Sequence, residues 1–105
     1  MYDFRNKSAL IIDDLADARS FLRIYLSNLG FESAPQVARI RDALDILRQF
    51  KPDIIVCDYY LGDDIDGQQF LEYLRINNLI SPSVAFVMVT AESTYARVAS
   101  AAEYA

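Results

Sequence analysis

The feature that most constrains the fold is a set of three short, uninterrupted apolar runs. They are Ser8–Ile12 (SALII), Ile54–Cys57 (IIVC) and Val84–Val89 (VAFVMV). Each run is long enough for a strand and too short for a helix, and none alternates between apolar and polar residues. Continuous apolar strands are typical of parallel sheets that are buried on both faces. The runs therefore predict an α/β protein.

Helical patterns lie between these runs. Apolar residues recur at helical spacing in three intervals: 22–29, 40–47 and 70–74. Gly30 stands where the first of these helices is expected to end, and an alanine-rich fourth helix is expected from about Glu92. A weak edge strand is expected over Phe31–Gln36, because Pro35 has no N–H to donate. This alternation predicts one domain over residues 1–105, with helices on both faces of the sheet.

Composition excludes several classes of function. The 105 residues allow one core, and a net charge of -5 argues against direct nucleic-acid binding by this segment. No apolar stretch approaches the roughly 20 residues that span a bilayer, and no secretory signal is visible, so a cytoplasmic protein is expected. The single cysteine, Cys57, is expected to be a buried thiol. The absence of histidine excludes a histidine-based metal site.

Polar side chains follow the three apolar runs. Asp13 and Asp14 follow the first, Asp58 the second and Thr90 the third. Because ligands of open α/β sheets bind beyond the carboxyl ends of the strands, we expect these side chains to converge at one edge. Individually they have simpler explanations: Asp14 or Thr90 as helix caps, and Asp13 or Asp58 as turn residues.

Three clustered carboxylates require a proton or a cation. Like charges a few ångströms apart repel by roughly 4 kcal/mol per pair at an effective dielectric constant of about 20. Carboxylate oxygens without histidine or cysteine favour a hard ion, and a few ligands with water in the remaining positions suit Mg²⁺. Mg²⁺ on carboxylates commonly accompanies a phosphoryl group.

Three segments together resemble the receiver domains of two-component response regulators. They are IIDD (Ile11–Asp14), IIVCDYYLGDDIDG (Ile54–Gly67) and MVTAE (Met88–Glu92). The resemblance covers essentially the whole chain. It implies a flavodoxin-like, doubly wound parallel sheet with strand order 2-1-3-4. It also implies a signalling module rather than an enzyme.

The resemblance assigns the acidic residues their roles. Asp58 would accept a phosphoryl group from a phosphohistidine on a sensor histidine kinase or a histidine phosphotransfer protein. Asp14 and Asp58 would bind Mg²⁺ directly, Asp13 mainly through water, and the carbonyl of Tyr60 would complete the protein ligands.

The third segment would couple phosphorylation to output. The resemblance makes Thr90 the switch hydroxyl that bonds a phosphoryl oxygen, and Ala91 the small residue whose N–H approaches the same group. Tyr60 and Glu92 would tune the access of hydrolysing water. The surface formed by the fourth strand and helix would carry the signal.

The sequence departs from the receiver pattern in two places. Gly62 stands where many receivers have proline, and the loop before Gly67 is one residue longer. Receivers also have a fifth strand that ends in a lysine, followed by a fifth helix, whereas these 105 residues stop inside the expected fourth helix or just past it. We therefore expect a C-terminally incomplete receiver with impaired phosphoryl transfer. Its exposed fourth strand would pair with a second copy or an exchanged segment, giving a homodimer.

Other functions fit less well. A phosphatase of the haloacid dehalogenase type requires a second aspartate where Tyr60 stands, and the loop after Ser8–Ile12 lacks the glycines of a nucleotide-binding site. A pseudo-receiver, an inactive fragment that acts only in protein interaction or dimerisation, stays open as the alternative.

Overall fold

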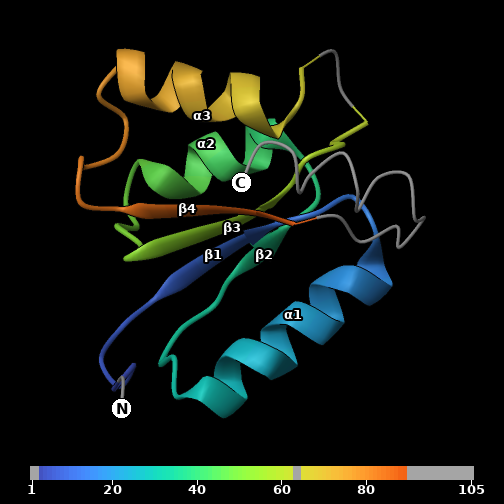
Figure 1. Ribbon diagram of the computed structural model, residues 1–105, viewed down its shortest axis with the longest axis vertical. Coiled ribbons are helices and arrows are strands. Elements are labelled where there is room, and N and C mark those ends of the chain that lie inside the picture. Colours follow the sequence, from blue (N-terminus) through green and yellow to red (C-terminus); the bar gives the residue numbers. More distant parts are fainter. Residues whose placement is uncertain (1–2, 63–64, 90–105) are drawn as a thin grey trace.

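The computed structural model describes residues 3–62 and 65–89, which form a four-stranded parallel sheet with order β2-β1-β3-β4 (Figure 1). The strands are β1 (Ala9–Ile12), β2 (Gln36–Val37), β3 (Ile54–Asp58) and β4 (Ala85–Val89). The helices are α1 (Ala16–Leu29), α2 (Ile40–Leu47) and α3 (Gly67–Ile76). The predicted α/β class and the strand order 2-1-3-4 are thus confirmed.

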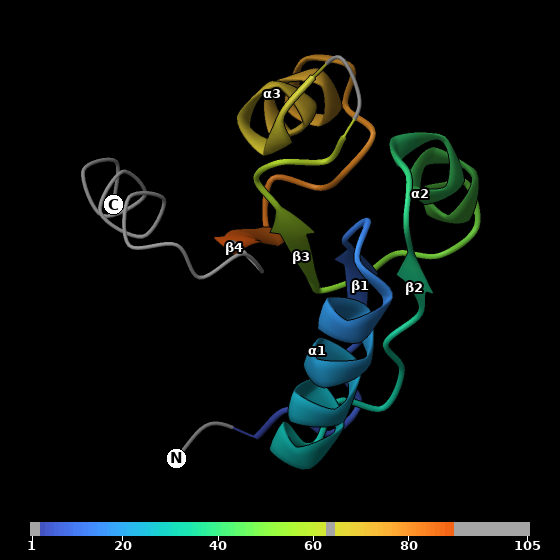
Figure 2. The same cartoon turned by 90° about the vertical axis from the view of Figure 1, so that its right-hand side faces the viewer.

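The helices cover opposite faces of the sheet. Figure 2 shows α1 on one side, and α2 and α3 on the other. Alternate residues of β1 serve the two sides: Leu10 and Ile12 belong to the larger core beneath α2 and α3, whereas Ala9 and Ile11 pack with Leu26 of α1. All four residues of β1 are fully buried, as its continuous apolar run predicts. Burial of each large aliphatic side chain contributes about 1.5–3 kcal/mol.

Helix α1 ends as the sequence predicts. Gly30 adopts a left-handed φ of 106°, and its N–H donates to the carbonyl of Ser27. The N–H of Phe31 donates to the carbonyl of Leu26. Glycine tolerates this conformation because it has no Cβ.

The second strand is shorter and later than predicted. Only Gln36 and Val37 form β2, so the predicted bounds of 31–36 were wrong. The segment before it offers carbonyls to β1, since Ser33 accepts from Ala9 and Pro35 accepts from Ile11. Pro35 has no N–H with which to complete a ladder.

Strand β4 is the outermost strand among the described residues. It pairs with β3 from Ile54↔Ala85 to Asp58↔Val89, and none of its residues is fully buried. Thr90, Ala91 and the helix expected from about Glu92 lie outside the described residues. In the portion of the chain that the structure describes, no helix has the length and apolar character needed to cross a membrane.

Candidate functional site

Asp13, Asp14 and Asp58 meet at the carboxyl end of the sheet. One carboxylate oxygen from each lies within 4.8 Å of the other two. The register explains this meeting: Ile12 of β1 pairs with Cys57 of β3, so Asp13 and Asp58, which follow them, lie side by side. Three of the four predicted side chains therefore converge, and the fourth, Thr90, lies outside the described residues.

Asp13 is fixed in a buried position. Its side chain is fully buried, which excludes the alternative of a solvated turn residue. Its Oδ1 accepts a hydrogen bond of 2.9 Å from the N–H of Leu15. Its Oδ2 is buried without a hydrogen-bond partner among the described residues. A buried carboxylate oxygen without a partner is costly unless a proton or a cation satisfies it.

Asp14 does not cap the first helix. The residue at the N-cap is Leu15, which makes no side-chain capping bond. Asp14 is exposed, and one of its oxygens belongs to the acidic cluster. The capping alternative is therefore wrong.

Asp58 ends β3 and is almost completely buried, with 4% of its surface exposed. Its Oδ1 accepts a hydrogen bond of 3.3 Å from the N–H of Tyr60. The Tyr60 ring packs edge-on against Tyr59 at a centroid distance of 4.8 Å and remains partly exposed. Tyr60 therefore lies beside the acidic cluster, and a metal-binding role for its carbonyl stays a prediction.

Burial and mutual repulsion shape the electrostatics. Burial, reinforced by the negative charge of Asp14, raises the pKa of the Asp13 carboxyl, although the bond from Leu15 and the nearby Arg19 oppose the shift. Burial raises the pKa of the Cys57 thiol to about 12, and the charges of Asp58 and Asp13 add to this effect. The site thus resists accumulating negative charge in the absence of a cation.

The donor set fits Mg²⁺. All the donors identified are carboxylate oxygens, which hard cations prefer, and Oδ2 of Asp13 is buried without a protein partner among the described residues. Asp13, Asp14 and Asp58 are the residues that would hold such an ion.

The structure adds Arg19, which the sequence analysis did not single out. Its Nη1 donates a hydrogen bond of 2.9 Å to the carbonyl of Asp13, so a side chain of α1 fixes the backbone of Asp13. The sequence hint is its position six residues after Asp13, in the first turns of the helix.

Strand β4 extends alongside the site. Val89 pairs with Asp58, and its carbonyl accepts from the N–H of Tyr59 at 3.0 Å. Thr90 is the next residue in the sequence. The described part of β4 therefore reaches the level of Asp58.

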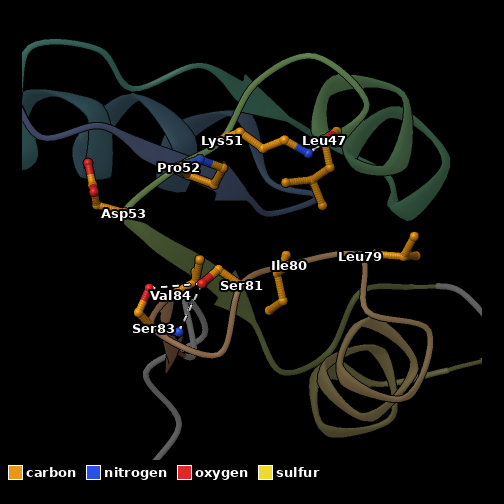
Figure 3. Close-up of a pocket in the computed structure, with 9 residues that line it drawn as sticks. All are labelled: Leu47, Lys51, Pro52, Asp53, Leu79, Ile80, Ser81, Ser83 and Val84. Atoms are coloured by element: carbon orange, nitrogen blue, oxygen red, sulfur yellow. Dashed lines mark hydrogen bonds between the residues drawn. The ribbon is translucent and has the colours of Figure 1, made fainter.

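A hollow of about 230 Å³ lies at the opposite end of the sheet, where β3 and β4 begin (Figure 3). Leu47, Ile80 and Val84 line it, and Lys51 extends along one side of it to donate to the carbonyl of Leu47 at 3.4 Å. Because it lies at the amino ends of the strands, this hollow is not part of the acidic site.

Comparison with known proteins agrees with this geometry. The sequence profile of the response regulator receiver domain matches residues 9–105. Two curated relatives are the probable transcriptional regulator ycf29 of Cyanophora paradoxa, 35% identical over 68 residues, and the chemotaxis protein CheY of Thermotoga maritima, 28% identical over 71 residues. These alignments cover 65% and 68% of this chain. They span only 31% and 59% of the relatives' own lengths.

A solved structure is also similar. The MaeR response regulator bound to beryllium trifluoride superposes with a TM-score of 0.72 and 25% identity, over 94% of this chain and 79% of that one. The profile match covers all four strands of the sheet and the three aspartates at its edge, so the chain belongs to the response regulator receiver domain family.

Proposed function

We propose that this chain is a phosphoacceptor receiver domain, with residues 1–105 forming one domain and Asp58 as the acceptor. This proposal rests on the position of Asp58, which is buried beside Asp13 and Asp14. One carboxylate oxygen from each of the three residues lies within 4.8 Å of the other two. An oxygen of Asp58 would bond to phosphorus while the bond from phosphorus to the donor's imidazole nitrogen breaks and its electron pair stays on that nitrogen. Each chain would accept one phosphoryl group rather than turn over substrate.

The acidic neighbours would prepare Asp58 for this transfer. A bound Mg²⁺ supplies positive charge that offsets both the carboxylates and the incoming phosphoryl oxygens. Asp13 and Asp14, with the carbonyl of Tyr60, would hold that ion against Asp58. Arg19 and the Leu15 N–H fix Asp13 through hydrogen bonds of 2.9 Å each.

The proposed output runs through the strand beside Asp58. Thr90 would donate its hydroxyl to a phosphoryl oxygen, and the N–H of Ala91 would donate to the same group, so that the loop after β4 responds to phosphorylation. The pairing of Asp58 with Val89 supports this, because Thr90 follows Val89 directly.

The phosphoryl donor would be a histidine kinase or a histidine phosphotransfer protein in the cytoplasm. The family and the similarity to MaeR bound to beryllium trifluoride support this class of partner. We also propose a homodimer contact along β4, where Val87 is 41% exposed.

The test of the acceptor is labelling by a small phosphodonor such as acetyl phosphate in the presence of Mg²⁺. We expect at most one base-labile adduct per chain, formed at Asp58, lost on removal of Mg²⁺ and lost in Asp58→Ala. Asp45→Ala, at an exposed position of α2, serves as the control that should still be labelled. Undiminished labelling of Asp58→Ala would rule out Asp58. A folded wild-type chain that takes no label would favour the pseudo-receiver.

A further inference from the structure

The loop after Asp58 passes directly against the acidic cluster at Gly62. Gly62 has a left-handed φ of +73°, and a Cβ built on it would lie 3.2 Å from Oδ2 of Asp14. Apart from the chain neighbours of Gly62, no other heavy atom of the described residues lies within 4 Å of that position. The space that a side chain would fill at residue 62 is therefore bounded by a carboxylate oxygen of Asp14, a residue of the candidate cation site.

A methyl group at this position would displace Asp14 rather than the backbone. A separation of 3.2 Å is tighter than an ordinary contact, so one partner must move by a few tenths of an ångström. Asp14 is exposed and can rotate outward, whereas its neighbour Asp13 is buried and bonded to Leu15. Such a rotation would change the position of the Asp14 carboxylate relative to those of Asp13 and Asp58.

We propose that Gly62 is a positioning residue of the cation site, which keeps Asp14 within reach of the ion by having no side chain. This inference rests on the proposed function, because it assumes that the cluster binds Mg²⁺. Proline, which many receivers carry here, cannot take Gly62's place in this loop, since its ring fixes φ near about -65°. The positive φ at position 62 in this loop therefore excludes proline and favours glycine.

A glycine with positive φ has a simpler explanation, which is relief of backbone strain alone. Gly30 separates the two explanations. It also has a positive φ, of +106°, but a Cβ on it would meet Phe4 and Arg5 only at ordinary distances of 3.8–3.9 Å. Alanine at either position carries left-handed strain of about 1–2 kcal/mol. Only alanine at position 62 crowds a carboxylate of the site.

The first experiment compares the variants Gly62→Ala and Gly30→Ala with the wild-type 105-residue chain. Calorimetric titration gives the dissociation constant for Mg²⁺, and urea unfolding in EDTA gives the stability without metal. We expect both variants to lose similar stability. Only Gly62→Ala should bind Mg²⁺ more weakly, by about tenfold or more, as when the support of a metal ligand is lost. Equal Mg²⁺ affinity in Gly62→Ala and the wild type would overturn the proposal.

A second experiment removes the strain and keeps the methyl group. Cys57 is the single cysteine, so ligation of a synthetic segment from 57 to 105 can place D-alanine at position 62. D-Alanine accepts positive φ and directs its methyl to the other side of the backbone. We expect its Mg²⁺ affinity to stay within about twofold of a ligated Gly62 protein, even if Gly62→Ala does not fold. A loss like that expected for L-alanine would overturn the role of Asp14 crowding.

The two experiments separate this inference from the proposed function. If neither the wild type nor Gly30→Ala binds Mg²⁺, both the metal part of the proposed function and the role of Gly62 fail. If both bind Mg²⁺ and Gly62→Ala binds equally well, only the role of Gly62 fails.

Discussion

The two carboxylate oxygens of Asp13 lie in different environments. Oδ1 is bonded to the N–H of Leu15, while Oδ2 is buried and lacks a partner among the described residues. Burial raises the pKa of this carboxyl, which means that its ionised form costs stability in the folded protein. A bound cation would turn that cost into binding energy. Asp13 should therefore affect stability with opposite signs in the absence and presence of Mg²⁺.

Asp13→Asn tests this reversal. Asparagine keeps an oxygen for the Leu15 N–H and removes the buried charge, so in EDTA we expect the free energy of unfolding to rise by about 1 kcal/mol. In saturating Mg²⁺ the wild type should gain more and become the more stable protein. Urea unfolding under both conditions measures the difference. Asp17→Asn, an exposed aspartate in the first turn of α1, should show no such reversal.

The thiol of Cys57 reports on opening of the same region. It is fully buried in β3, and burial raises its pKa to about 12, so little thiolate exists near pH 8 in the folded protein. We expect a thiol reagent to label the native chain about a thousandfold or more slowly than the urea-unfolded chain. Mg²⁺ should slow the labelling further. Labelling of the native chain at the rate of the unfolded chain would contradict the buried strand.

At the scale of elements, the contact between α3 and β3 fixes Asp58. The N–H of Gly67 donates to the carbonyl of Tyr59 at 2.8 Å. A Cβ on Gly67 would lie 3.1 Å from the carbonyl oxygen of Asp58 and 3.2 Å from Cα of Tyr59. Both are backbone atoms, which cannot move independently of the strand. The first turn of α3 therefore constrains the backbone of Asp58 and Tyr59.

Gly67→Ala should destabilise the protein although alanine favours helix. The crowding should cost about 1–3 kcal/mol, which exceeds the gain in helix propensity of about 1 kcal/mol. Urea unfolding checks the value. Gln68→Ala, at the next and exposed position of α3, should change stability by less than about 0.5 kcal/mol. A Gly67→Ala protein as stable as the wild type would show that α3 can shift freely away from β3.

Most elements could be predicted from sequence because their signals are local. The apolar runs of β1 and β3 and the C-cap at Gly30 need no tertiary information. Strand β2 could not be placed in the same way, because its bounds depend on which carbonyls reach β1 rather than on its own pattern. For the acidic cluster, strand order was enough to bring Asp13 and Asp14 beside Asp58.

Several details of the site depend on loop paths and side-chain rotamers that no sequence pattern specifies. Capping chemistry made Asp14 a candidate helix cap, yet the helix begins after Leu15 and leaves that carboxylate in the cluster. The approach of Gly62 to Asp14 depends on the course of a loop, and the bond from Arg19 depends on a side-chain rotamer. The roles of Thr90 and Ala91 stay predictions, because both residues lie outside the part of the chain that the structure describes.

At the scale of the whole molecule, cation binding at one edge should stabilise the entire domain. A ligand that binds only the folded state at a hundredfold its dissociation constant stabilises by about 2.7 kcal/mol. We expect Mg²⁺ to raise the urea midpoint of the wild type by a corresponding amount. Asp14→Asn and Asp58→Asn should lose most of this shift, because each removes one of three ligands. If Mg²⁺ raised the urea midpoint of both variants as much as that of the wild type, the ion would bind elsewhere.

The most direct test is to locate the ion with Mn²⁺, which shares the preference of Mg²⁺ for carboxylate oxygens. In a two-dimensional NMR spectrum with assigned amide signals, we predict broadening strongest around Asp13, Asp14 and Asp58. It should saturate at one ion per chain and be reversed by excess Mg²⁺. Broadening centred on another acidic segment, such as the one around Asp42 and Asp45 of α2, would contradict the account.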